Sequence, residues 1–185
     1  MNTLEYYPTP VQFVKPCVEA LHGQAARLEN VIDVACGAGE FASVWEQEHG
    51  GRIWKQDIIN RLGWDDPLLL IGDFLTTMPT GGCKYDVIMM NPPFSMATEF
   101  ILHAKLLLAD DGVLGAFLSH GYLTGVDRSN RLWSWTPTDM LCFNRRIFFN
   151  GGCDRYGRMF VIWSKYQPPF TRFRFVNVPS SKITK

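Results

Sequence analysis

The sequence has no apolar run long enough to cross a membrane. Its uninterrupted apolar segments are short, as at Met159–Trp163, whereas a transmembrane helix needs about 20 apolar residues. The first residues also lack the basic segment and apolar core of a secretory signal peptide. These absences argue against a membrane protein and a secreted one, so we expect the protein to be cytoplasmic.

Cysteine and histidine are present but are not spaced as metal ligands. The five cysteines form no CxxC pair, and the four histidines form no cluster with metal-ligand spacing. An odd number of scattered cysteines is typical of reduced thiols in the cytosol. We therefore expect no metal site and no structural disulfide.

The net charge is zero, but it is distributed unevenly along the chain. Residues 1–127 carry 7 basic and 16 acidic side chains, whereas residues 128–185 carry 11 basic and 2 acidic. This asymmetry suggests that the last third faces a polyanion, although the two parts could instead neutralise each other in the folded domain. The candidate nucleic-acid contacts are Arg128, Arg131, Arg146, Arg155, Tyr156, Arg158, Arg172 and Arg174.

A strand, a glycine-rich turn and a helix follow one another near the start of the chain. Asn30–Ala35 reads as a buried strand, Cys36–Ala42 contains glycines at positions 37 and 39, and the helix runs to about His49. This order brings backbone N–H groups and a helix N-terminus to a ligand. The next strand ends at Asp57, 20 residues after Gly37, the distance typical of a carboxylate that binds ribose hydroxyls.

The same turn also satisfies GxGxxA, so a nicotinamide or flavin dinucleotide is an alternative ligand. Asp33 bears on this choice, because a carboxylate beside the turn would repel a pyrophosphate but attract an amino or sulfonium group. Asp33 could equally cap the N–H groups of the loop.

A third strand, Leu68–Gly72, is followed by Asp73 and Phe74. An acceptor and an aromatic ring at the carboxyl end of a strand are well placed to bind adenine, because open α/β sheets bind ligands at that edge. The alternative is that Asp73 only caps the following turn and Phe74 belongs to the core.

The most specific pattern is Asn91-Pro92-Pro93-Phe94, directly after the strand Tyr85–Met90. Two prolines remove two N–H donors, so the polar groups that remain are mainly acceptors, namely the Asn91 amide oxygen and nearby carbonyls. Phe94 adds an aromatic face beside them. Such a loop suits a planar ring that carries an amine.

The other elements complete an α/β domain. Helices are expected at Val11–Leu21, with Thr9 as N-cap and Pro10 as first residue, and at Ser95–Ala109. A fifth strand is expected at Val113–Leu118, a loop with a short helix at Gly121–Trp135, and a closing antiparallel pair at Arg146–Phe149 and Met159–Trp163. The basic, aromatic tail from about residue 168 suits a nucleic-acid contact or an added edge strand.

These residues together resemble the S-adenosylmethionine-dependent N6-adenine DNA methyltransferases. Asp33–Gly39 is similar to their cofactor loop, Asn91–Phe94 to their catalytic tetrapeptide, and Tyr7–Pro10 to an N-terminal segment that contacts the cofactor in one subgroup. Gly151–Tyr156 is similar to the loop that helps to receive the target base. The resemblance covers most of residues 6–165.

The resemblance implies a fold, a cofactor and roles for individual residues. The fold would be a Rossmann-like class I methyltransferase domain over residues 1–185, with a mostly parallel seven-stranded sheet, a C-terminal antiparallel hairpin and helices on both faces. Catalysis would rest on Asn91, Pro92, Pro93 and Phe94. The residues expected to hold S-adenosylmethionine are Tyr7, Thr9, Pro10, Asp33, Ala35, Cys36, Gly37, Gly39, Asp57, Asp73, Phe74 and Asn91.

The expected reaction is methylation of the N6 amine of an adenine swung out of the DNA duplex, assisted mainly by positioning. The chain has no room for the separate target-recognition domain of larger relatives, which fits compact forms encoded by phages or mobile elements. An RNA amino-group methyltransferase remains an alternative, because related tetrapeptides occur in RNA and protein methyltransferases. More distant alternatives are a dinucleotide-dependent oxidoreductase and a non-catalytic binding module.

Overall fold

The computed structural model describes residues 7–63, 65–78, 82, 84–125, 130–132, 135–149, 152–153, 157–165 and 169–179. The predicted sites at Arg128, Arg155 and Tyr156 lie outside these ranges. None of the helices in the described ranges has the length and apolar character that spanning a bilayer requires.

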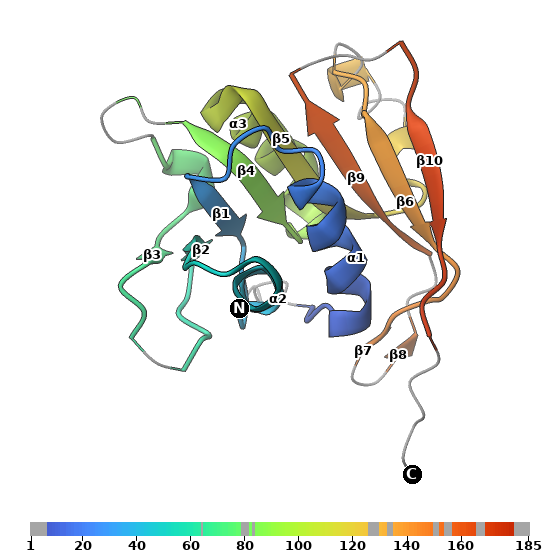
Figure 1. Cartoon of the computed structure of the whole chain (residues 1–185). Helices are drawn as coiled ribbons and strands as arrows, with labels where there is room; N and C mark the ends of the chain where they lie inside the picture. Colours follow the sequence, from blue (N-terminus) through green and yellow to red (C-terminus); the bar gives the residue numbers. More distant parts are fainter. Residues whose placement is uncertain are drawn as a thin grey trace.

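A mixed eight-stranded sheet forms the centre of the molecule, in the order β10-β6-β9-β5-β4-β1-β2-β3 (Figure 1). Strands β1 to β5 run parallel, β9 is antiparallel to both of its neighbours, and β10 is parallel to β6. The mostly parallel α/β architecture is therefore confirmed, with one strand more than predicted. The strands are β1 (Val31–Val34), β2 (Trp54–Asp57), β3 (Leu69–Ile71), β4 (Tyr85–Met90), β5 (Leu108–Ser119), β6 (Asp139–Phe143), β9 (Arg158–Ser164) and β10 (Arg172–Val176).

The strand order reverses direction at β1. From β1 the chain moves outward to β2 and β3, and it then returns to the other side of β1 to form β4 and β5. Connections after β1 and β4 therefore leave the sheet on opposite sides, which opens a crevice between their carboxyl ends. The glycine-rich turn follows β1 and the Asn-Pro-Pro-Phe tetrapeptide follows β4, so both predicted motifs lie at this crevice.

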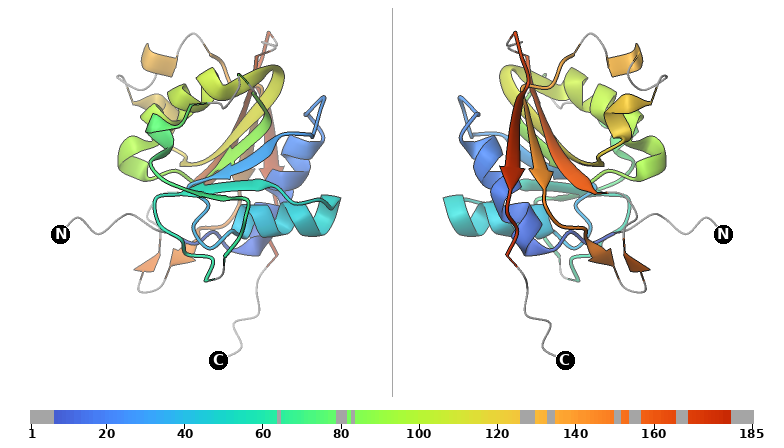
Figure 2. Two further views of the ribbon diagram at one scale, coloured as in Figure 1. Left: turned by 90° about the vertical axis from the view of Figure 1, so that its left-hand side faces the viewer. Right: turned by 90° about the vertical axis from the view of Figure 1, so that its right-hand side faces the viewer.

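Helices cover both faces of the sheet, as predicted. Helices α1 (Val11–His22) and α2 (Glu40–His49) lie on one face and α3 (Ala97–Leu107) on the other (Figure 2). Alternating strand residues divide between two cores, because successive side chains point to opposite faces of a sheet. Val31 and Val87 pack with α1 and α2, whereas their neighbours Ile32 and Ile88 pack with α3.

The predicted C-terminal hairpin is wrong in one of its two strands. Met159–Trp163 is confirmed as part of β9, but the antiparallel partners of β9 are β5 and β6, and β6 was not predicted. Phe148–Phe149 forms the short strand β7, which pairs with β8 (Gly152–Cys153) in a separate two-stranded sheet. β7 pairs with the segment that immediately follows it, where the entropic cost of closing the loop is small.

Two further expectations concern the start of helix α3 and the C-terminal tail. Helix α3 begins at Ala97 and not at Ser95, after the 3-10 turn η3 (Phe94–Met96), and its N-cap is Met96. The tail forms β10 at the edge of the sheet, so its edge-strand alternative is the one observed.

Candidate active site

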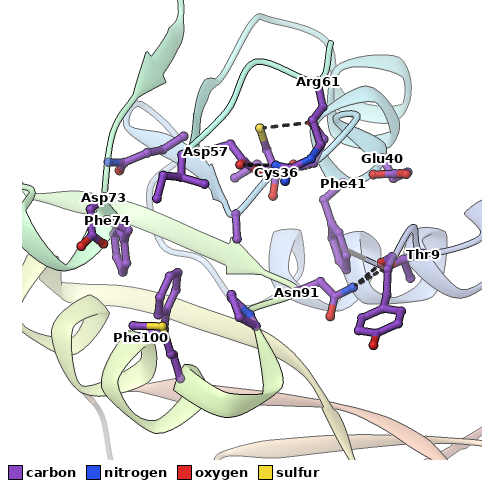
Figure 3. A pocket seen from close by; sticks show the side chains of 18 of the residues that line it. Thr9, Cys36, Glu40, Phe41, Asp57, Arg61, Asp73, Phe74, Asn91 and Phe100 are labelled. Atoms are coloured by element: carbon purple, nitrogen blue, oxygen red, sulfur yellow. Dashed lines mark hydrogen bonds and ion pairs between the residues drawn. The ribbon is translucent and has the colours of Figure 1, made fainter. Parts of the chain in front are cut away.

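A cavity of 530 Å³ opens at the carboxyl ends of β1, β2, β3 and β4 (Figure 3). In Figure 3, Asp73, Phe74 and Phe100 lie at one end of the cavity, Thr9 and Asn91 at the other, and Asp57 and Arg61 between them. All of the predicted cofactor residues line it except Pro10 and Gly39.

The turn after β1 follows a tightly wound path. Ala35, Gly37 and Gly39 all have positive φ angles, of 54°, 58° and 83°. Gly39 is the N-cap of α2, and a Cβ atom there would lie 2.9 Å from Leu62 Cδ2. Gly39 does not line the cavity, but the turn requires a glycine at this position. Any side chain would be strained at this φ angle and would clash with Leu62.

Asp57 holds this turn against the end of β2. Its carboxylate accepts hydrogen bonds from the Gly37 N–H at 2.9 Å and the Ile59 N–H at 3.2 Å, and it pairs with Arg61 at 2.5 Å. The predicted ribose partner therefore lines the cavity while it braces the loop. Arg61 was not predicted; its position four residues after Asp57 is the signal that could have indicated this ion pair.

Asp33 contributes an acceptor with no partner in the described part of the chain. Its side chain is fully buried, and Oδ2 accepts the Ala42 N–H at 3.0 Å whereas Oδ1 has no hydrogen bond there. Burial raises the pKa of the Asp33 carboxyl well above its ordinary value, an effect that the Ala42 N–H opposes and Glu40 reinforces. The predicted capping role is thus present, and one oxygen remains for a ligand with N–H groups.

The charge of the cavity lining is predominantly negative. Its charged side chains among the described residues are Asp33, Glu40, Asp57, Asp73 and Arg61. Glu40, which sequence reasoning missed, lies in the first turn of α2 directly after Gly39. The lining therefore favours a cationic ligand and disfavours a pyrophosphate.

The opposite end of the cavity is aromatic. Phe74 is buried, and its ring lies 5.3 Å from that of Phe100, which is also in the lining. Asp73 accepts the Leu75 N–H at 3.0 Å as N-cap of the 3-10 turn η1 (Phe74–Thr76). The capping alternative for Asp73 is therefore realised, and Asp73 also lines the cavity.

Two hydrogen bonds orient the Asn91 side chain. Its amide nitrogen donates to the Tyr7 carbonyl oxygen at 3.0 Å and to Thr9 Oγ1 at 2.9 Å. Because a carbonyl oxygen can only accept, the amide group must point its NH₂ toward Tyr7. Oδ1 is then the atom of Asn91 that can accept from a ligand in the cavity.

Thr9 therefore has a different role from the predicted one. Pro10, not Thr9, is the N-cap of α1, and the buried Thr9 side chain binds Asn91 instead. The contact joins residues far apart in the sequence, so local helix-start signals could not reveal it. Pro10 lies outside the cavity lining.

Phe94 packs against two residues from distant parts of the chain. Its ring stacks on Tyr7 with a centroid separation of 5.1 Å, and the Arg158 guanidinium carbon lies 4.1 Å from its centroid. Phe94 remains 37% exposed, so part of its surface is accessible. Pro93 lines the cavity, and Pro92 is buried beneath the loop.

Cys36 lies in the lining, but its thiol is poorly suited to act as a nucleophile. Burial raises the pKa of the Cys36 thiol, and the nearby carboxylates of Asp33 and Asp57 raise it further. The reactive thiolate form is therefore disfavoured. The described residues contain no group of three or more side chains arranged to hold a metal ion.

No protein-family model matches the sequence, and none of the curated proteins matches it. Solved structures do match. A type I restriction-modification methyltransferase subunit from Streptococcus thermophilus aligns with a TM-score of 0.68 and 17% identity, over 92% of this chain and 47% of the subunit. The chain has the class I methyltransferase fold. It spans about half the length of that subunit.

Two further structures with this fold extend the comparison. A candidate RNA methyltransferase from Pyrococcus horikoshii aligns with a TM-score of 0.69 and 18% identity, over 88% of this chain and 86% of that one. A candidate class I S-adenosylmethionine-dependent methyltransferase from Listeria monocytogenes gives 0.64 and 13%, over 93% and 66% of the two chains. At these identities the likeness shows the fold alone.

Three of the predicted nucleic-acid contacts pair with carboxylates of the same chain. Arg172 and Arg174 pair with the fully buried Asp139 at 3.2 and 2.6 Å, and Arg131 pairs with Glu99 at 2.7 Å. The side chains of all three arginines nevertheless remain exposed, so their contact with a nucleic acid stays a prediction.

The remaining two predicted contacts in the described ranges differ from each other. Arg146 is exposed, whereas Arg158 is 4% exposed and packs on Phe94. Arg158 thus belongs to the surroundings of the tetrapeptide rather than to the outer surface.

Several residues of the cavity lining were not predicted. They are Glu40, Phe41, Gln56, Ile58, Arg61, Gly72, Ser95, Met96 and Phe100. Most directly follow or flank a predicted site residue, so proximity along the chain was the signal that could have found them. Phe100 had no such signal, because the side of α3 that faces the cavity depends on how α3 packs.

Proposed function

We propose that this chain transfers a methyl group from S-adenosylmethionine to the exocyclic N6 amine of an adenine flipped out of DNA. The observation that carries the proposal is the orientation of Asn91. Tyr7 and Thr9 hold its NH₂ group, so Oδ1 is left to accept from an amine. An acceptor fixed in this way, next to a negatively charged cavity, suits an amine substrate beside a cationic methyl donor.

The cavity fits the proposed cofactor in charge and polarity. The buried Oδ1 atom of Asp33 suits the amino group of the cofactor, Asp57 suits its ribose, and the aromatic end at Phe74 and Phe100 suits its adenine. When bound, S-adenosylmethionine supplies an electrophilic methyl group on a sulfonium. The same negative lining disfavours the dinucleotide alternative, whose pyrophosphate is anionic.

The residues of the tetrapeptide would act by positioning. Asn91 Oδ1 and the Pro92 carbonyl would accept the two N–H groups of the amine and so direct its lone pair toward the methyl donor. Neither acceptor can take up a proton at neutral pH, so the proton that the amine loses leaves to water. Phe94 would stack on the base, which has to share the Phe94 ring with Tyr7 or displace it.

Product analysis tests which polymer is the substrate. The protein is incubated with methyl-labelled S-adenosylmethionine and unmethylated duplex DNA, RNA or protein, and the products are hydrolysed and separated. We expect label in N6-methyldeoxyadenosine. Label in RNA alone would show that the substrate is RNA and not DNA. This outcome is included because a candidate RNA methyltransferase has the same fold. Absence of label from all three substrates would contradict the proposed activity.

Thr9 offers a test of the orientation of Asn91. Thr9→Val keeps the shape of the side chain but removes the hydroxyl that accepts from Asn91 Nδ2. We expect turnover to fall roughly fivefold, because one neutral hydrogen bond of about 1 kcal/mol no longer holds the amide. Thr9→Ser should restore turnover.

Cofactor affinity separates this role from a direct cofactor contact. If Thr9 acts through Asn91, the dissociation constant for S-adenosylhomocysteine should be unchanged in Thr9→Val. A loss of affinity that accounts for the whole loss of turnover would instead assign Thr9 to the cofactor site.

A further inference from the structure

Gln56 places a second buried acceptor without a described partner in the cavity lining. Its side chain is 3% exposed, and its Oε1 atom has no hydrogen bond to the described residues. A buried acceptor without a partner costs free energy, about 1–3 kcal/mol in mutational data. A ligand N–H group in the cavity would remove that cost.

The surroundings of Gln56 locate it at the aromatic end of the cavity. Gln56 pairs in register with Val34, whose side chain lies in the same core as Phe74 and Phe100. Its Nε2 atom contacts Thr77 Oγ1, directly after the turn η1 that carries Phe74. The unpartnered oxygen thus lies on the side of the sheet where two aromatic rings line the cavity, away from Asp33.

Hydrogen bonds at Thr77 fix which way the Gln56 amide points. The Thr77 hydroxyl donates to the Asp73 carbonyl oxygen at 3.4 Å, so its oxygen accepts from Gln56 Nε2. His103 Nε2 in turn contacts the Thr77 carbonyl oxygen at 2.9 Å and holds that residue in place. With Nε2 bound to Thr77, Oε1 is the atom left for the cavity.

We propose that Gln56 recognises the adenine ring of the cofactor, with Oε1 accepting a hydrogen bond from an N–H of the exocyclic amine. This inference rests on the proposed function, since it assigns the adenine to the aromatic end of the same cavity. Asp73 is the competing acceptor. However, Asp73 is exposed and already caps η1 with one carboxylate oxygen, whereas Gln56 is buried and its oxygen has no described partner.

The test compares two ligands that differ at the C6 amine and at the neighbouring ring nitrogen N1, which is an acceptor in the adenosyl ligand and an N–H donor in the inosyl ligand. Calorimetry with the wild-type protein measures the affinity for S-adenosylhomocysteine and for S-inosylhomocysteine, which carries a carbonyl oxygen in place of the amine. We expect the inosyl ligand to bind at least roughly tenfold more weakly, because two acceptors then face each other without a proton between them. Failure of both ligands to bind would contradict the proposed function itself.

Gln56→Met should remove the discrimination. The variant has similar volume but no acceptor, so affinity for the adenosyl ligand should fall roughly tenfold, whereas affinity for the inosyl ligand should not fall, because that ligand loses only a repulsive contact. The ratio of the two affinities should therefore fall by at least roughly tenfold in the variant. Gln47→Met, the same change on the exposed face of α2, is the matched control and should leave both affinities unchanged.

Gln56→Glu keeps an acceptor at the same place and provides a second test, also if the methionine variant fails to fold. It should retain the preference for the adenosyl ligand. Equal affinities in Gln56→Glu, or an undiminished preference in Gln56→Met, would overturn the assignment of Gln56. A preference that Gln56→Met retains and Asp73→Ala abolishes would assign the reading of adenine to Asp73.

Discussion

Replacing Asn91 by alanine is expected to abolish most methyl transfer while cofactor binding persists. The substitution removes the only side-chain acceptor of the tetrapeptide, together with the hydrogen bonds to Tyr7 and Thr9 that orient it. A positioned hydrogen-bonding group of this kind contributes about a hundredfold to a thousandfold to turnover. We expect a loss of that size in the turnover number.

The measurement combines product formation with calorimetry for S-adenosylhomocysteine. Affinity for this ligand should change less than turnover, because Asp33 and Asp57 remain in place. Asn144→Ala is a suitable control, since Asn144 is exposed and its partners Asn177 and Val178 lie near the end of β10. An Asn91→Ala protein with undiminished turnover would remove Asn91 from the mechanism.

The parallel half of the sheet could be predicted because each strand there is marked locally. Val31–Val34 and Tyr85–Met90 are short, mostly apolar runs that are buried in the structure, and turn residues follow each of them. Once the strands are assigned, the strand order places their carboxyl ends together. The association of Asp33, Asp57 and Asn91 in one cavity follows from these two steps.

The C-terminal half carries weaker local signals. Asp139–Phe143 begins with a charged residue, and that residue is fully buried and bound by Gln24 and by Arg172 and Arg174 from β10. Phe148–Phe149 has the stronger apolar pattern, yet it pairs with the residues that follow it rather than with β9. Strand pairing there depends on contacts between distant segments, which single-sequence patterns do not contain.

The charge pattern did not show how individual arginines of the last third are paired. The excess of basic residues after residue 127 is real, yet Arg131, Arg172 and Arg174 are paired with carboxylates, and Arg158 is buried. Composition cannot distinguish an arginine that faces solvent from one that anchors a strand. Sequence patterns likewise do not show the direction in which the side chains of Thr9 and Gln56 point.

Asp33→Asn is expected to change stability and ligand affinity in opposite directions. In the folded protein, burial raises the pKa of the Asp33 carboxyl, so the folded state binds a proton more tightly than the unfolded chain does. The stability that this provides is present below the ordinary carboxyl pKa of 3.8 and is lost as the pH rises toward the folded value. The asparagine variant has no such loss.

At neutral pH we therefore expect Asp33→Asn to be more stable than the wild type, by about 1–3 kcal/mol, the cost of a buried polar group without a partner. Urea unfolding at a series of pH values measures this. The wild-type free energy of unfolding should fall more steeply above pH 4 than that of the variant. Asp86→Asn is the matched control, because Asp86 is also buried but accepts the Glu29 and Asn30 N–H groups and lies outside the cavity.

The control should lose stability and keep its affinity, whereas Asp33→Asn should gain stability and lose affinity. A charge-assisted hydrogen bond to the ligand ammonium group is worth about 1.5–3 kcal/mol, so affinity for S-adenosylhomocysteine should fall roughly tenfold to a hundredfold. Wild-type affinity should also rise with pH as the Asp33 carboxyl ionises, and that rise should be absent from the variant. A variant that is stabilised but binds with wild-type affinity would show that the buried carboxylate serves the loop and not the ligand.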